Sequence, residues 1–322
     1  MFQSIINTLY RQPRSQWRTY QKFGGYFAYR HMQKAEDDMR KASARIKVLA
    51  PANDLPRLEV SFLTGKKYWH QTVFCAYSLQ KHSTNAIRFV FYDDGSFTPD
   101  LLKQYQAQIP NSQFVTLSEI EARLALALPK RKYPYLHLKR EVYKHIRKLT
   151  DVYAGNLGWK LMLDSDMLFM RSPQLMLQWL QNPSQPFHII DSETSYGYSL
   201  QTMGELSGSS IKEKINVGVL GLHSSMVDFD RLEHWAKTLE TNHGTSYYLE
   251  QALSAMLVGD QECTVGPSSD YIVYPTQNQV ETKAGVLHHY VDVSKKWYFE
   301  TAWKYFRQSL DYLWQPKTKK MV

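Results

Sequence analysis

The stretch 159–166, WKLMLDSD, is a short apolar run that leads directly into two aspartates. A short apolar run bounded by polar residues is typical of a buried strand. Three similar runs precede it, at 58–64 (LEVSFLT), 86–92 (AIRFVFY) and 113–117 (QFVTL), and helices are expected at 68–82, 101–108 and 136–149. This alternation predicts an α/β fold with a mainly parallel sheet and helices on both faces.

Asp164 and Asp166 therefore stand at the carboxyl end of a strand, where ligands bind in open α/β sheets. Carboxylates at positions i and i+2 suit a hard divalent cation, Mn²⁺ or Mg²⁺, which in turn holds a diphosphate. The spacing alone is weak evidence, since Asp-x-Asp is expected by chance roughly once in 320 residues. A second copy, Asp228-Phe-Asp230, precedes an expected helix at 231–239, so Asp230 is interpreted as a helix N-cap or first-turn acid.

A second group of polar residues lies at 286–297, VLHHYVDVSKKW. A neutral imidazole is a suitable further ligand for Mn²⁺, and a lysine six residues later could neutralise the phosphates of a leaving nucleoside diphosphate. A strand is expected at 286–291, and because His288 and His289 are adjacent on it, their side chains face opposite sides and one metal takes only one of them. The alternative is a half-buried histidine pair on an edge strand with solvated lysines.

Together these two motifs resemble the GT-A glycosyltransferases, and among them the family 8, glycogenin-like retaining enzymes. Those end their catalytic domain with His, five residues, Lys, Pro and Trp. The resemblance implies that His289 joins Asp164 and Asp166 on the metal and that Lys295 holds the diphosphate. It further implies a pocket for the sugar and the acceptor, where the matching residues are Asn216, Gly218, Glu250 and Gln251. It also implies a nucleotide-binding loop, which matches Thr64 and Gly65. Ser165 and Trp297 lie within the two motifs themselves and are expected to contact the substrate.

The sequence departs from this family pattern at three positions. Asp292 replaces a glycine whose backbone approaches the phosphate, Lys296 replaces the proline, and Glu250 replaces an aspartate. A carboxylate at position 292 would repel a diphosphate unless it points away from it.

Other candidates have a structural and a functional interpretation. Asp94, which follows Asp93 at the end of the second strand, is expected either to bind a nucleobase or ribose or to stabilise a turn. Lys139, like Arg140, is either a base that contacts the donor or a solvated helix charge. The region from Tyr196 to residue 210 is expected to form a long loop that closes over the sugar.

Charge is distributed unevenly along the 322 residues, which carry a net charge of +9. Residues 1–57 hold eleven basic and four acidic residues and many aromatics, whereas 58–316 is close to neutral, which argues against nucleic-acid binding.

We divide the chain into a helical extension (1–57), a catalytic domain (58–300) and a C-terminal helix with a basic tail (301–322). The extension is expected either to contact an anionic membrane as a peripheral segment or to pack on its own domain. With no apolar span, no signal core and two cysteines, a cytoplasmic location is expected.

These observations predict a metal-dependent hexosyltransferase. It would move a sugar from a nucleoside-diphosphate donor, a UDP-sugar in the first instance, to a glycan, lipid or protein acceptor with retention of configuration. One alternative is a nucleotidyltransferase, which should have a glycine-rich loop after the first strand, where LTGKKYW supplies one glycine. A glycoside hydrolase would need two carboxylates flanking a sugar. A non-catalytic membrane-surface or scaffold protein would have no use for Asp164, Asp166 or His289.

Overall fold

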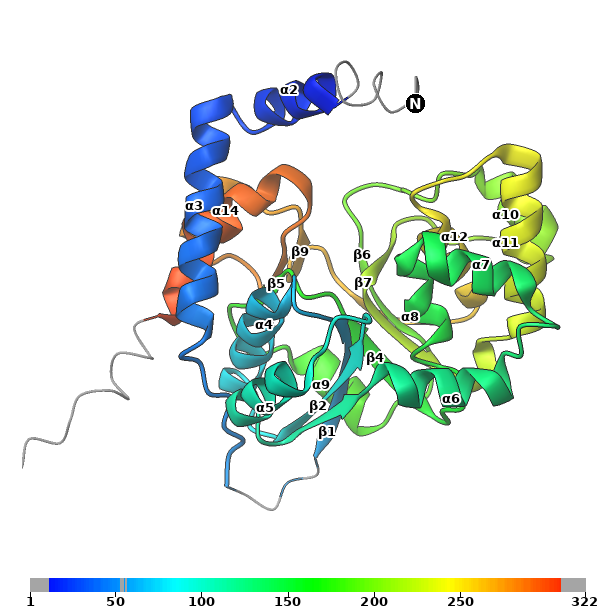
Figure 1. The fold of residues 1–322 in the computed structure, drawn as a ribbon, viewed down its shortest axis with the longest axis horizontal. Coiled ribbons are helices and arrows are strands. Elements are labelled where there is room, and N and C mark those ends of the chain that lie inside the picture. The colour runs from blue at the N-terminus through cyan, green and yellow to red at the C-terminus, as the bar shows by residue number, and fades with distance from the viewer. Residues whose placement is uncertain (1–11, 53–54, 56, 308–322) are drawn as a thin grey trace, which may run out of the picture.

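The computed structural model describes residues 12–52, 55 and 57–307, and these form two sheets surrounded by helices (Figure 1). The larger sheet has the strand order β3-β2-β1-β4-β7-β6-β8. Its strands are β1 (Leu58–Thr64), β2 (Ile87–Asp93), β3 (Ser112–Val115), β4 (Trp159–Leu163), β6 (Phe187–Ile190), β7 (Ile215–His223) and β8 (Thr264–Gly266). All neighbouring pairs are parallel except those that β7 makes with β4 and β6.

A smaller sheet has the order β5-β10-β9, with β5 (Met167–Phe169), β10 (Leu287–His289) and β9 (Tyr271–Val273). The α-helices are α2 (Gln12–Lys22), α3 (Tyr26–Ser43), α4 (Trp69–Lys81), α5 (Pro99–Gln108), α6 (Leu117–Ala127), α7 (Pro134–Val142), α8 (Arg147–Thr150), α9 (Gln174–Gln181), α10 (Leu200–Ser207), α11 (Phe229–His243), α12 (Leu249–Val258), α13 (Gln277–Glu281) and α14 (Lys295–Glu300). Short 3₁₀ helices occupy Lys144–Ile146 (η2), Ser224–Met226 (η3), Asp292–Ser294 (η4) and Ala302–Phe306 (η5).

The larger sheet is buried on both faces, as its nearly continuous apolar strands require. Along β2, Phe89 and Phe91 join one hydrophobic core while Val90 and Tyr92 join the other, because successive side chains of a strand point to opposite faces. Figure 1 shows α3, α4 and α5 on one side of the sheet and α6, α7 and α10–α12 on the other. The predicted mainly parallel sheet with helices on both faces is confirmed.

Two expected elements differ from the observed ones. The helix expected at 136–149 is broken at Tyr143, whose backbone angles (φ −137°, ψ 85°) are not helical, so that α7, η2 and α8 replace it. The break lets α8 take its own direction and, as shown below, it carries Lys148 to the end of β4. The strand expected at 286–291 is shorter, and it lies in the middle of the smaller sheet.

The extension contributes to the core of the molecule. Helix α3 buries Met32, Ala35 and Met39, which lie in the same hydrophobic core as β1 and α4. The Gln108 side-chain amide also donates a hydrogen bond to the Ser43 carbonyl (2.6 Å). Three parts of the chain lie outside the described residues: the extension before residue 12, the positions of Asn53, Asp54 and Pro56, and the tail from 308 to 322. Among the described helices, none is both long and apolar enough to cross a membrane.

Candidate active site

The turn after β4 carries the two aspartates that the sequence singled out. Because β7 is antiparallel to β4, its first residues lie at the same edge of the sheet, and the Asp164 amide donates to the Gly218 carbonyl (2.8 Å). On the other side, the Thr72 hydroxyl lies 2.8 Å from the Ser165 hydroxyl and 2.6 Å from that of Thr64. The turn is therefore held between the start of β7 and a hydroxyl chain that joins β1, α4 and Ser165.

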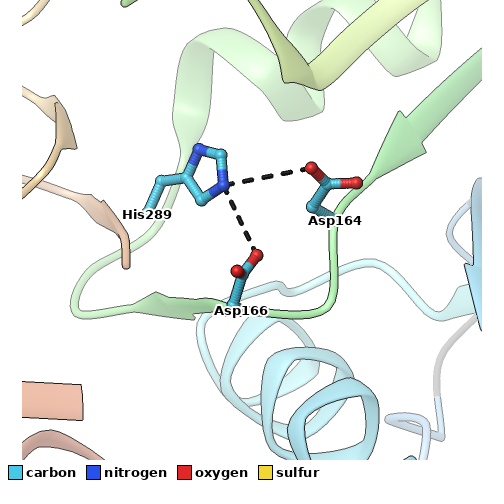
Figure 2. Close-up of side chains that lie close together, drawn as sticks. All are labelled: Asp164, Asp166 and His289. Carbon is cyan, nitrogen blue, oxygen red and sulfur yellow. Dashed lines mark ion pairs between the residues drawn. The ribbon is translucent and has the colours of Figure 1, made fainter. Parts of the chain in front are cut away.

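The smaller sheet brings His289 to this turn, although 123 residues separate it from Asp166 in the sequence. Strand β5 continues directly from Asp166, and β10 pairs with it so that His289 lies opposite Met167. His289 Nε2 is 3.4 Å from Asp166 Oδ1 and 4.0 Å from Asp164 Oδ2 (Figure 2). One ligand atom from each of the three residues lies within 4.8 Å of the others.

Gly218 leaves the space that the His289 ring fills. A Cβ atom at position 218 would stand 2.3 Å from His289 Cε1 and 2.8 Å from the Met167 methyl group, distances that side chains do not tolerate. His289 is buried, and within the described structure its Nδ1 has no hydrogen-bond partner. Its ring is thus oriented by packing. His288 faces the other side of β10, where Nε2 lies 2.6 Å from the Ala284 carbonyl oxygen.

Two ammonium groups flank the carboxylates. Lys295 Nζ lies 3.0 Å from Asp166 Oδ2, and Lys148 Nζ lies 2.6 Å from Asp164 Oδ1. Burial by itself would raise the pKa of Asp166, but the nearby Lys295 and His289 together lower that pKa well below its ordinary value. The carboxylate raises the pKa of Lys295 in turn. The pKa of Lys148 is also raised, since Asp164 and Glu250 outweigh the effect of its burial. Asp166 and both lysines are therefore charged at neutral pH.

Glu250 lies behind Lys148 at the start of α12. Its carboxylate is only 5% exposed, and the nearest ammonium group, that of Lys148, is 4.0 Å away. Burial raises the pKa of Glu250 to about 7, and Lys148 opposes this rise only in part. A carboxyl group that is half protonated near neutral pH can donate as well as accept a hydrogen bond.

Asn216 and Gln251 converge on an acidic residue that the sequence did not single out. Asp191 Oδ2 accepts hydrogen bonds from Asn216 Nδ2 (2.9 Å) and Gln251 Nε2 (3.3 Å). Asn216 Oδ1 in turn accepts from the Gly218 amide (3.0 Å), which connects this group to the residue against which His289 packs. A carboxylate and two amides thus lie next to the Asp-Asp-His cluster. They come from the end of β6, the start of β7 and the first turn of α12.

The cluster fits a divalent cation. Two carboxylates and one imidazole converge, and Gly218 keeps the imidazole in place. This mixture of oxygen and nitrogen donors suits Mn²⁺ better than Mg²⁺, which prefers oxygen ligands and bound water.

Several candidate residues are used elsewhere. Lys139 Nζ bonds Glu240 Oε1 (2.8 Å), and both side chains are buried. Arg140 pairs with Asp151 and Glu121, so both cations of this helix have structural partners. Trp297 packs against the hydrophobic core. The region expected to be a long loop, from residue 196 to 210, contains α10.

Asp93 and Asp94 differ in their surroundings. Asp93 Oδ1 accepts from the amides of Gly95, Ser96 and Phe97 and thereby stabilises the turn after β2. Asp94 Oδ1 lies against Gly65, where a Cβ atom would stand 2.0 Å from it. In the second Asp-x-Asp, Asp228 is the N-cap of α11 and Asp230 lies in its first turn. Asp230 is thus the first-turn acid, one of the two roles expected for it.

Three residues of this site escaped the sequence analysis. Thr72 and Asp191 belong to no motif, and their roles depend on strands that are distant in sequence. Lys148 falls within the helix that was expected to be continuous. The break at Tyr143 turns Lys148 toward Asp164, and the sequence contains no glycine or proline there that would predict a break. The basic run RK at 147–148 was the one available signal.

Comparison of the sequence with models of known protein families gave no match. No curated protein matches it either. Among solved structures, the chain is similar to the galactosyltransferase LgtC in complex with donor and acceptor sugar analogues, with a TM-score of 0.50, 16% identity, and coverage of 80% of this chain and 95% of LgtC. A structure of an active-site mutant of LgtC gives a TM-score of 0.51, 18% identity, and coverage of 81% and 98%. The chain thus has the GT-A glycosyltransferase fold that its sequence predicted.

Proposed function

We propose that this protein is a metal-dependent glycosyltransferase that uses a nucleoside-diphosphate sugar, with a UDP-sugar as the first donor to test. The observation that carries the proposal is the cluster of Asp164, Asp166 and His289 between Lys148 and Lys295, at the carboxyl end of β4. A structure with donor and acceptor sugar analogues exists for LgtC, which has the same fold and is named a galactosyltransferase.

Each charged residue of the cluster has a role in this proposal. Asp164, Asp166 and His289 would hold Mn²⁺ or Mg²⁺, and Lys295 and Lys148 would face the diphosphate. When bound, the cation supplies Lewis-acid stabilisation of the charge on the leaving phosphate. The two lysines add preorganised positive charge at the same place, because their ammonium groups are held by the carboxylates before any substrate arrives.

The nucleoside would lie at the ends of β1 and β2. There Thr64, Gly65 and Asp94 meet, and the missing side chain of Gly65 lets the Asp94 carboxylate approach the main chain. A carboxylate at this place can accept hydrogen bonds from ribose hydroxyls or from a base N–H.

The donor sugar would be positioned by Asp191, Asn216 and Gln251, with Glu250 beside them. We propose a same-face displacement: the bond between the anomeric carbon and the phosphate oxygen breaks, and the acceptor oxygen bonds to that carbon from the same side. The acceptor proton passes to the departing phosphate oxygen. Configuration is then retained without a covalent enzyme intermediate.

The acceptor is a glycan, lipid or protein, and an anionic membrane surface is the proposed place where the enzyme meets it. Around the turn between α2 and α3, Trp17, Tyr26 and Phe27 are 61%, 49% and 85% exposed. Basic residues interleave with them, namely Arg18, Arg30 and Lys34. Exposed aromatics with interleaved positive charge are typical of segments that lie on anionic bilayers.

Replacing Asp166 or His289 with alanine should test the cluster. Asp166→Ala should reduce transfer by about a thousandfold or more, since the bound cation is expected to supply several kcal/mol of barrier reduction. His289→Ala should weaken metal-dependent UDP binding. Initial rates with radiolabelled UDP-sugars and calorimetric titration of UDP with Mn²⁺ measure the two effects. Lys295→Ala should mainly slow turnover.

Two variants serve as matched controls. Asp228→Ala removes a carboxylate with the same spacing and should cost about 1 kcal/mol of stability as a lost N-cap, with transfer unchanged. His288→Ala should lower stability but leave metal binding intact. Undiminished transfer by Asp166→Ala, or loss of metal binding by His288→Ala alone, would contradict the assignment.

The anomeric configuration of the product tests the proposed displacement. Proton NMR of the first-formed product should show the donor's configuration. An inverted anomer would refute the same-face route and make Glu250 the first candidate for a general base.

Glu250 should make stability depend on pH. Its pKa is raised from 4.5 to about 7, so the native state is penalised as pH rises through this interval, because there it retains a proton that the unfolded chain releases. The stability advantage of Glu250→Gln over the unmodified protein should grow by about 3 kcal/mol between pH 4.5 and pH 7. Urea unfolding in metal-free buffer measures it, and the exposed Glu262→Gln should show no such trend. If the difference in stability between Glu250→Gln and the unmodified protein did not change with pH, the raised pKa of Glu250 would be refuted.

Membrane contact can be tested by sedimentation with vesicles. The full chain should sediment with vesicles containing phosphatidylserine but not with pure phosphatidylcholine, since each basic residue near an anionic surface contributes about 1 kcal/mol. Trp17→Ser combined with Phe27→Ser should release it, and added salt should weaken binding. Equal sedimentation with both vesicle types, insensitive to salt, would refute the proposal.

A further inference from the structure

Asp292 occupies the middle of the loop that joins His289 to Lys295. Both of those residues contact Asp166, at 3.4 Å and 3.0 Å. Asp292 has a φ of +51°, a left-handed conformation that glycine adopts freely and that most other residues avoid. A carboxyl side chain is thus held at strained backbone angles in the loop between two residues that contact Asp166.

The charge of Asp292 is unfavourable for the proposed substrate. Lys148 and Lys295 compensate Asp164 and Asp166, whereas Asp292 would add a further negative charge to the loop between His289 and Lys295, which in the proposed function lies against a diphosphate. Like charges repel each other near a protein surface more strongly than they would in bulk water. The loop needs either a neutral residue at this position or a cation that compensates it.

That cation comes from the N-terminal extension. Lys22, at the end of α2, places its Nζ 2.5 Å from Asp292 Oδ1. The two side chains are 50% and 43% exposed, so the pair lies at the surface. Among the described residues, Asp292 has no other ion pair.

The geometry of the α2–α3 turn fixes the position of Lys22. Gly24 and Gly25 have φ values of +90° and +102°, which reverse the chain between the two helices. The turn is closed by a hydrogen bond from the Gly25 amide to the Tyr20 carbonyl (2.6 Å). Aromatic contacts of Tyr20 and Phe23 with Tyr29, at 5.4 Å and 5.6 Å between ring centroids, hold α2 on α3.

Helix α3 is itself anchored beside the site. Met39 is fully buried in the core, and the His31 ring lies 3.0 Å from the Glu300 carboxylate of α14, the helix that begins at Lys295. Figure 1 shows α3 alongside α14, with α2 turning away from the first residues of α3. Lys22 is therefore placed relative to the His289–Lys295 loop before any ligand binds.

We propose that Lys22 is a positioning residue for the donor site. By pairing with Asp292 it draws that carboxylate away from the site and neutralises it, so that the loop can accept a diphosphate. The inference rests on the proposed function and adds that the N-terminal extension completes the donor site. It also explains how an aspartate is tolerated at position 292.

The test is a double-mutant cycle on the full chain, with UDP binding in the presence of Mn²⁺ measured by calorimetry. Lys22→Glu should weaken UDP binding roughly three- to tenfold at low salt, as expected when a surface ion pair is turned into a repulsive one. In the Asp292→Asn background, which keeps a residue tolerant of positive φ, the same change should alter affinity less than about twofold. Lys22→Arg should restore affinity, and added salt should reduce the effect.

Arg18→Glu, an equal charge reversal one turn away on α2, is the matched control and should leave affinity unchanged. A Lys22 effect of the same size in both backgrounds, or no effect in either, would overturn the inference while leaving the proposed function standing. An effect of Arg18→Glu equal to that of Lys22→Glu would overturn it as well, because the charge of α2 as a whole would then be responsible. If the unmodified protein and the Asp292→Asn variant both fail to bind UDP with Mn²⁺, the proposed function fails and the inference with it.

Discussion

Two carboxylates held in one turn at the end of β4 determine much of what surrounds them. Asp164 and Asp166 are close enough to repel each other, and burial makes that repulsion costly. The structure compensates each with its own ammonium group, Lys148 from one side and Lys295 from the other. These lysines come from α8 and α14. Compensating the two carboxylates therefore brings together segments that are distant in the sequence.

Packing imposes a second condition, which is as strict as the electrostatic one. The imidazole of His289 reaches the carboxylates only because residue 218 of β7 has no side chain. The register of β10 against β5 then selects His289 and turns His288 to the opposite side. A shift of this register by one residue would place His288 or Tyr290 opposite Met167 and turn His289 away from the carboxylates.

The extension and the site are physically connected. Helix α3 lies in the same core as β1 and α4, and α2 reaches the His289–Lys295 loop through Lys22. The region around the turn between these helices is also where Trp17 and Phe27 are exposed. The residues proposed to meet a membrane therefore lie within a few positions of Lys22, which contacts the His289–Lys295 loop.

Local sequence patterns were sufficient for much of the architecture. The apolar runs at 58–64, 86–92 and 159–163 predicted β1, β2 and β4, because strands buried on both faces need nearly continuous apolar residues. The position of Asp164 and Asp166 at a strand end followed from the same pattern. The alternation of side chains on a strand also separated His289 from His288. These features depend on neighbours within a few residues.

The remaining features depend on distances that a linear pattern does not contain. Lys139 and Lys148 lie in what looked like one helix, yet one is buried against Glu240 and the other faces Asp164, because the chain bends at Tyr143. Asp191 belongs to the candidate site only because its carboxylate accepts hydrogen bonds from the amides of Asn216 and Gln251, which are 25 and 60 residues away in the sequence. Sequence determined that β1, β2 and β4 form and where the carboxylates stand, since both follow from local burial. Tertiary structure alone decided which cations meet those carboxylates, since charge pairing acts through space.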